Sequence, residues 1–270
     1  DCHSHIWPKF GEHPFRTGIQ AKDLKPASFT AEDLIAAGKP FGIDKFCLIQ
    51  HIYYHGYDSS YFKMVSAQYP GKFAIVGAID KNDPTIEEKM KLDEGSDVSG
   101  YRIPSKDRES WLLGSKMDRY WSLAAEYKQS ICLLRNRNVS LQSVYKKCKL
   151  NPKTKVVIDH YAHVDFNDRE EVNVLWQLSE MDNVYLKVSK YYGNGQMTPP
   201  YFDMLPVFKQ VLEKFGSEKL MWGSDCPYQL EGQHSYQAAF EVLDKYADFM
   251  SPLDRQNIFQ NTAEKVFFKS

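Results

Sequence analysis

The sequence has 270 residues, 43% of them apolar, which is enough material for one large domain with a substantial core. Its 34 basic and 35 acidic side chains nearly cancel, so the chain lacks the strongly basic face that nucleic acid or an acidic membrane surface requires. No apolar run approaches the roughly 20 residues that cross a bilayer. These properties indicate a small-molecule partner.

Five cysteines are scattered along the chain, and Cys47, Cys132 and Cys226 lie in or beside apolar runs. An odd number of such residues is typical of free, buried thiols in a reducing compartment, so we expect a cytoplasmic protein. The sequence begins directly at Asp1, and a first strand there would need a few apolar residues before it. A targeting segment upstream therefore stays an open alternative.

A short apolar run, a loop and an amphipathic segment alternate along the whole chain. Several of the runs are apolar almost throughout, as strands covered on both faces should be. The predicted strands span residues 1–6, 46–50, 73–79, 100–103, 131–134, 156–159, 184–189 and 220–223. Eight strands that alternate with helices predict an α/β fold with a parallel sheet, in one domain over residues 1–270.

The helical segments carry their own start and stop signals. Thr30 is a predicted N-cap for a helix that Gly38 ends. Apolar residues recur at three-to-four spacing over 168–181 and 235–250, which predicts two amphipathic helices. Ser251-Pro252 then predicts the cap and first turn of a last helix. No glycine-rich dinucleotide fingerprint follows any strand, which weakens an open-sheet, cofactor-binding interpretation.

His3 and His5 are two residues apart in the first predicted strand. Alternate side chains of a strand point to the same face, so both imidazoles can converge on one metal ion or substrate group. A chance pair of surface histidines is the competing interpretation.

Asp225 and His160 each follow an apolar strand directly. A carboxylate at such a position is costly unless a cation or hydrogen bonds receive it, although a helix N-cap would also explain Asp225. A lone histidine after a strand is more often structural. Together, however, three strand ends supply three imidazoles and one carboxylate, a set suited to binding a metal or activating water.

Four further residues are predicted to contact a substrate. Arg102 and Lys187 are charges inside otherwise apolar strands, which need an anionic partner. That partner is either a substrate carboxylate or an internal ion pair. Gln50 ends a strand and Trp7 follows the histidine pair, so both are expected to line the pocket.

Five motifs in chain order resemble the "amidohydrolase 2" branch of the amidohydrolase superfamily, which includes sugar-acid lactonases and pyrone-dicarboxylate lactonases. They are Asp1-Cys-His-Ser-His-Ile-Trp7, Val157-Ile-Asp-His160, Lys187-Val-Ser189, Gly223-Ser-Asp-Cys-Pro227 and Asn261-Thr-Ala263. The resemblance spans nearly the whole chain. It implies a closed (β/α)8 TIM barrel with its reaction at the carboxyl ends of the strands.

The resemblance also implies roles for the strand-end residues. His3, His5, His160 and Asp225 match the family's metal-binding or carbonyl-polarising set, and Asp225 would take a proton from the attacking water. Zinc is the expected ion and manganese the second choice. Arg102 matches an arginine that faces the substrate.

The chain departs from the metal-using members of the superfamily at one strand. Residues 131–135 offer neither the histidine nor the lysine that usually completes their metal site. Some lactonases also lack that ligand and work without metal, so a metal-independent reaction stays open. The segment Asp159-His-Tyr-Ala-His163 and Cys226 also differ from the usual lactonase residues. The substrate of a known lactonase therefore cannot be assigned to this chain.

We therefore predict a hydrolase, in particular a lactonase that cleaves the cyclic ester of a small sugar acid or a carboxylated lactone. Two alternatives remain. A metal-dependent decarboxylase would use the same barrel with a bound ion. A non-catalytic barrel that binds a small molecule would leave the four strand-end side chains splayed apart.

Overall fold

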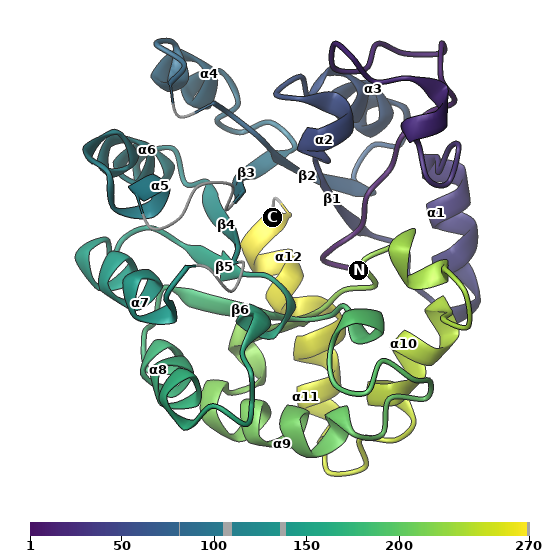
Figure 1. The fold of residues 1–270 in the computed structure, drawn as a ribbon, viewed down its shortest axis with the longest axis vertical. Coiled ribbons are helices and arrows are strands. Elements are labelled where there is room, and N and C mark those ends of the chain that lie inside the picture. The colour runs from purple at the N-terminus through teal and green to yellow at the C-terminus, as the bar shows by residue number, and fades with distance from the viewer. Residues whose placement is uncertain (81, 105–109, 136–138, 269–270) are drawn as a thin grey trace.

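Seven parallel strands form one curled sheet whose order in space follows their order in the sequence. Figure 1 shows this fold in the computed structural model, which describes residues 1–80, 82–104, 110–135 and 139–268. The strands are β1 (Phe46–Ile49), β2 (Phe73–Gly77), β3 (Val98–Pro104), β4 (Ser130–Leu134), β5 (Val156–Ile158), β6 (Val184–Val188) and β7 (Leu220–Trp222). Each lies within one of the predicted runs or overlaps it closely.

The first residues of the chain close the sheet into a barrel. Ser4 forms parallel bridges to Leu48 in β1 and to Cys226 after β7. The amide of Ile49 donates to the carbonyl of Ser4 at 2.8 Å, and that of Asp225 donates to the carbonyl of His3 at 2.7 Å. The segment thus occupies the eighth position of the ring, and the predicted TIM barrel is confirmed.

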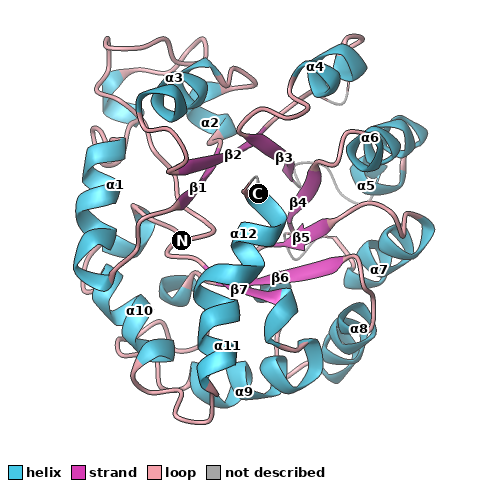
Figure 2. Cartoon of the chain, turned by 180° about the vertical axis from the view of Figure 1, so that it is seen from behind, coloured by secondary structure: helices cyan, strands magenta, loops and turns pink. Residues whose placement is uncertain are grey.

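Helices surround the strands on the outside, except for α12, which lies at one end of the barrel (Figure 2). They are α1 (Ala31–Gly38), α2 (Ile52–His55), α3 (Ser60–Gln68), α4 (Ile86–Leu92), α5 (Ser110–Leu113), α6 (Ser115–Glu126), α7 (Leu141–Leu150), α8 (Arg169–Ser179), α9 (Met204–Phe215), α10 (Tyr236–Asp244), α11 (Pro252–Gln256) and α12 (Thr262–Phe267). Thr30 and Ser251 cap α1 and α11 as predicted. No helix in the described part of the chain combines the length and the apolar character of a membrane span.

One predicted helix is shorter than its apolar pattern. The helix expected over 235–250 ends at Asp244, yet Ala247 and Met250 beyond it are still buried. The segment after Asp244 is not helical, but its apolar residues pack into the same core as α10. Their helix-like spacing in the sequence therefore predicted burial correctly and helix incorrectly.

Alternate residues of the strands build two separate cores. Those facing outward, such as Leu48, Ile75 and Leu186, join the shell under the helices. Those facing inward fill the barrel with α12: Cys2, Cys47, Ile49, Ala74, Val76, Cys132, Val157, Tyr185, Met221, Ala263, Val266 and Phe267. Seen from behind in Figure 2, α12 lies across the opening of the barrel. The opposite end, at the carboxyl ends of the strands, is left for polar side chains.

Candidate active site

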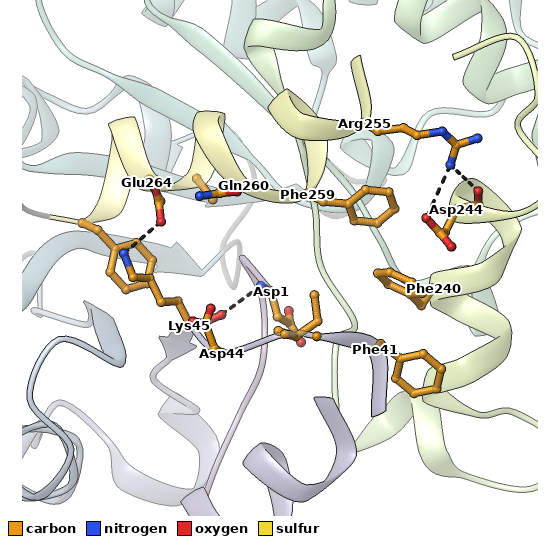
Figure 3. A pocket seen from close by; sticks show the side chains of 14 residues that line it. Asp1, Phe41, Asp44, Lys45, Phe240, Asp244, Arg255, Phe259, Gln260 and Glu264 are labelled. Atoms are coloured by element: carbon orange, nitrogen blue, oxygen red, sulfur yellow. Dashed lines mark hydrogen bonds and ion pairs between the residues drawn. The ribbon is translucent and has the colours of Figure 1, made fainter. Parts of the chain in front are cut away.

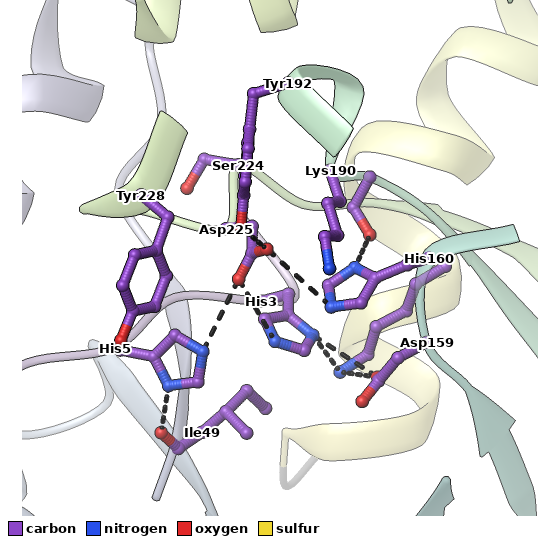
Figure 4. A network of polar contacts seen from close by, with 12 residues as sticks. His3, His5, Ile49, Asp159, His160, Lys190, Tyr192, Ser224, Asp225 and Tyr228 are labelled. Carbon is purple, nitrogen blue, oxygen red and sulfur yellow. Dashed lines mark hydrogen bonds and ion pairs between the residues drawn. The ribbon is translucent and has the colours of Figure 1, made fainter. Parts of the chain in front are cut away.

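The four strand-end residues predicted from the sequence meet in one cluster (Figure 4). Asp225 Oδ1 lies 3.5 Å from His3 Nε2 and 3.4 Å from His5 Nε2. The other carboxylate oxygen of Asp225 is 3.7 Å from His160 Nε2. All four side chains are buried. Residues from three separate places in the sequence therefore surround a single carboxylate.

Asp225 follows β7 in the left-handed region, with φ of 62°. Its Oδ2 accepts a hydrogen bond from the Tyr192 hydroxyl at 2.7 Å. Burial alone would raise the pKa of the Asp225 carboxyl, but the contacts with His160, His5 and His3 hold that pKa well below its ordinary value. Asp225 is therefore an ionised carboxylate with a fixed orientation.

A second carboxylate, Asp159, lies beneath the cluster and anchors two buried cations. Its Oδ1 is 3.1 Å from Lys187 Nζ, and its Oδ2 is 3.4 Å from Arg102 Nη2. His3 Nδ1 is 3.3 Å from the same Oδ1. Burial would raise the pKa of Asp159, but Lys187, His3 and Arg102 together lower it well below the ordinary value. Asp159 thus connects His3 to the charged interior of the barrel.

His160 begins a run of left-handed residues, His160–His163, with φ between 49° and 56°. Such backbone costs roughly 1 kcal/mol or more per residue unless contacts hold it. The guanidinium of Arg135, at the end of β4, donates to the carbonyls of Ala162 and His163. His160 Nδ1 lies 2.8 Å from Ser189 Oγ, which directs Nε2 toward Asp225.

The cluster fits a divalent cation. Nitrogen and oxygen atoms of His3, His5 and Asp225 lie within 4.8 Å of one another, as do those of His3, Asp159 and His160. His5 Nδ1 is 2.7 Å from the carbonyl of Ile49, which only accepts, so Nδ1 carries the hydrogen. The other ring nitrogen, Nε2, faces Asp225 Oδ1 at 3.4 Å, and a bound cation would attract both atoms.

The predicted substrate-binding residues lie around this cluster with other partners. Lys187 is fully buried and pairs with Asp159, so the structure favours the internal ion pair that the sequence left open. Arg102 shares that carboxylate but is 8% exposed. Gln50 is fully buried, and its amide bonds the backbone at Gly56, Asp58 and Ala78. The indole of Trp7 donates to the carbonyl of Pro26.

Sequence reasoning missed three residues at this site. Asp159 could have been found from strand alternation. It lies two residues after the inward-facing Val157, so its side chain also points into the barrel, where it pairs with Lys187 of the neighbouring strand. Tyr192 and Tyr228 had no such signal, since both lie on irregular segments after strands. Tyr228 Oη is 2.6 Å from Nε2 of His51, which follows Gln50 after β1.

A separate cavity of about 630 Å³ opens beside the start of β1 and the last helices (Figure 3). Four of its charged side chains pair with each other, Lys45 with Glu264 and Arg255 with Asp244. None of the four clustered strand-end residues lines it. The cluster at the other end of the barrel, and not this cavity, is the candidate active site.

Similarity to known proteins agrees with this geometry. The family model described as Amidohydrolase matches residues 1–269. The chain belongs to this family. It is 22% identical over 235 residues to 4-sulfomuconolactone hydrolase of Rhizobium radiobacter, covering 84% of this chain and 75% of that protein. It is also 22% identical over 273 residues to L-fucono-1,5-lactonase of Burkholderia ambifaria, covering 97% and 93%. The amidohydrolase is therefore a hydrolase with named lactone-hydrolysing relatives.

Solved structures share the barrel. An amidohydrolase of Burkholderia multivorans superposes with a TM-score of 0.83 at 18% identity, covering 99% of this chain and 98% of that one. It was crystallised with HEPES in one form and with zinc in another. The 5-carboxyvanillate decarboxylase of Sphingomonas paucimobilis superposes with a TM-score of 0.65 at 12% identity, covering 92% and 86%. These likenesses show that the chain shares the fold of both proteins.

Proposed function

We propose that this amidohydrolase opens a lactone, the cyclic ester of a small sugar acid or a carboxylated lactone, by direct attack of water. The observation that carries the proposal is the buried, ionised Asp225 carboxylate among three imidazole nitrogens. An ionised carboxylate beside polarising groups is the arrangement that general-base hydrolysis needs. The names of the two sequence relatives, both of which act on lactones, support the choice of bond.

Asp225 would act on the water at the start of the reaction. Its carboxylate accepts a proton while the water oxygen forms a bond to the lactone carbonyl carbon. The ring C–O bond then breaks, and the proton returns from Asp225 to the leaving alkoxide, so protons and charge balance. The bond from Tyr192 keeps the carboxylate oriented throughout.

His160 would stabilise the negative charge that grows on the carbonyl oxygen by donating from Nε2, with Ser189 at its Nδ1. His5, with a lone pair on Nε2, would instead act by binding a cation. His160 is held by Ser189, and His5 is held by the carbonyl of Ile49, so neither ring needs to reorganise during the reaction. Where a divalent ion is bound by His3, His5 and Asp225, its charge would polarise the same carbonyl. Zinc is the ion we propose and manganese the second choice, because nitrogen and carboxylate donors suit both.

A decarboxylase is the second candidate, favoured by the similarity to 5-carboxyvanillate decarboxylase and by the metal-competent cluster. The two candidates differ in their need for an ion. Metal analysis of the purified protein, followed by assays with and without a chelator, separates them. Carbon dioxide release that stops with the chelator would favour the decarboxylase.

Replacement of Asp225 by Asn tests the lactonase. The amide keeps the size of the side chain but cannot accept the proton, so we expect kcat on the best lactone from a substrate screen to fall about 100- to 10,000-fold. Asp182→Asn is the matched control, because Asp182 is exposed and precedes β6 at the other end of the barrel. Near-normal turnover by Asp225→Asn would disprove the general-base role.

A further inference from the structure

Lys190 follows β6 at the same end of the barrel as the histidine cluster. It takes a left-handed conformation, with φ of 63°. The amide of Asn194 donates to the carbonyls of Ser189 and Lys190, at 3.1 and 3.0 Å, and thereby holds this turn. Figure 4 shows the Lys190 side chain pointing into the imidazole cluster. The backbone of the turn thus directs a flexible cation toward the reaction centre.

The Lys190 ammonium lies against a neutral imidazole, that of His163. His163 Nδ1 lies against the carbonyl of Arg135, which only accepts, so Nδ1 carries the hydrogen. Its Nε2 therefore offers a lone pair to Lys190 Nζ at 3.4 Å. Burial lowers the pKa of His163, which agrees with the neutral ring. His163 orients the ammonium without cancelling its charge.

The carboxylates of the site are committed elsewhere. Asp159 pairs with Lys187 and Arg102, while Asp225 is surrounded by imidazoles and the Tyr192 hydroxyl. Across residues 1–80, 82–104, 110–135 and 139–268, Lys190 has no ion pair with a carboxylate; its other contact is the ring of Tyr192, 5.9 Å away. A half-buried cation without a counterion favours an anionic ligand.

Gly193 leaves the space that the Lys190 side chain occupies. A Cβ atom at this glycine would lie 2.7 Å from Lys190 Cε and 3.2 Å from Cγ. Real Cβ atoms do not approach so closely, so the lysine could not keep its place beside a larger residue. The position of the ammonium therefore depends on Gly193 as well as on His163.

We propose that Lys190 is an anion subsite beside His160 that binds a carboxylate carried by the substrate. This rests on the proposed function and narrows it, because the lactone would have to be an acidic one. It also differs from the assignment of Arg102 or Lys187, whose charges are already shared with Asp159. Lys190 would select the substrate and place its carbonyl near Asp225.

Kinetics with a matched pair of substrates test the subsite. The pair is a carboxylated lactone that the wild-type protein hydrolyses and the neutral primary amide of the same acid. We expect Lys190→Gln to raise KM for the carboxylate about 10- to 100-fold, the worth of a charge-assisted hydrogen bond, and to leave KM for the amide nearly unchanged. Lys190→Arg should restore much of the loss. Equal effects on both substrates would overturn the proposal.

Two further variants separate position from charge and from folding. Gly193→Ala keeps the lysine but displaces its flexible end, so it should raise KM for the carboxylate in the same direction by a smaller factor. Lys209→Gln is the control, because Lys209 is exposed on α9 and should change neither substrate. An unchanged KM for the carboxylated lactone with Gly193→Ala would contradict the role of this space.

A binding measurement keeps the subsite distinct from the lactonase. If the wild-type protein hydrolyses no lactone, the proposed function fails, but calorimetry with glutarate still tests Lys190. We expect glutarate to bind the wild-type protein about tenfold or more tightly than Lys190→Gln. Equal affinities, or no binding by the wild-type protein, would overturn the subsite.

Discussion

The two ends of the barrel are built on opposite principles. The end closed by α12 is apolar: Ala263, Val266 and Phe267 pack onto inward-facing strand residues. The end that carries the histidine cluster holds charges, imidazoles and left-handed backbone at residues 160–163 and 225. The first arrangement stabilises the fold through apolar burial, and the second is costly unless its groups pair or bind a ligand.

This contrast shows where stability and chemistry lie in the molecule. Substitutions at the α12 end should lower the free energy of unfolding and affect turnover by the folded protein less. Substitutions at the cluster should lower turnover, and they should lower the free energy of unfolding only where they leave a buried charge without its partner. Four measurements can break or sharpen this division.

Asp159→Asn should have the largest effect, because Asp159 lies where the two regions meet. Loss of its charge leaves Lys187 and Arg102 buried without a carboxylate, which costs about 3–5 kcal/mol. Turnover should also fall, because His3 loses the group beside Nδ1. Urea unfolding and kcat measure both effects. A variant with full stability would mean that the two cations find another counterion.

Phe267→Ala should have the second largest effect, because it creates a cavity at the α12 end of the barrel. Its ring is 3% exposed, and truncation of a buried phenylalanine costs about 3–5 kcal/mol. The kcat of the folded protein should fall less than with Asp159→Asn, because the ring reaches the cluster only through Lys187, whose Nζ lies 5.3 Å from the ring centroid. Phe202→Ala is the control, because Phe202 is 50% exposed and its loss should be small. A fall in kcat without a loss of stability would contradict the division.

The buried histidines make stability depend on pH. Burial lowers the pKa of His3 to about 3, of His51 to about 2 and of His55 to about 4. The unfolded chain binds these protons below a pKa of about 6.5, so their contribution is complete above that pH and is lost as pH falls toward the folded values. Each histidine should remove about 1.4 kcal/mol per pH unit between pH 6 and 5.

Urea unfolding of the chelator-treated protein at several pH values measures this slope. His55→Gln should reduce this slope by the contribution of one histidine, because His55 stacks on Tyr61 and is not one of the clustered strand-end residues. A stability that does not change between pH 6.5 and 5 would contradict the neutral, buried state of these rings.

Tyr192→Phe should have the smallest effect of the four. It removes the hydrogen bond to Asp225 Oδ2, so the carboxyl pKa rises and the acid limb of kcat/KM moves to higher pH. We expect kcat to fall about tenfold, the usual worth of one hydrogen bond to a charged group. Tyr191→Phe is the matched control, since that hydroxyl contacts Tyr161 instead. An unchanged pH profile would remove Tyr192 from the positioning of Asp225.

The sequence by itself determined the barrel and most of the cluster. Apolar runs of strand length predicted β1 to β7, and the bridges of Ser4 bear out a first strand position at residues 1–6. His3, His5, His160 and Asp225 were predictable because parallel strands end on the same side of a sheet, which converts sequence position into proximity. The local sequence pattern was sufficient to predict the surroundings of a residue wherever they are set by its position in a strand.

Only the tertiary structure decided which charges are internal and which face a ligand. Lys187 and Lys190 are three residues apart, yet one is paired with Asp159 and the other faces the cluster without a carboxylate. Tyr192 and His163 reach the site from irregular turns whose left-handed residues have no periodic signal. The partner of a charge depends on distances between remote segments, and those distances exist only once the barrel has closed.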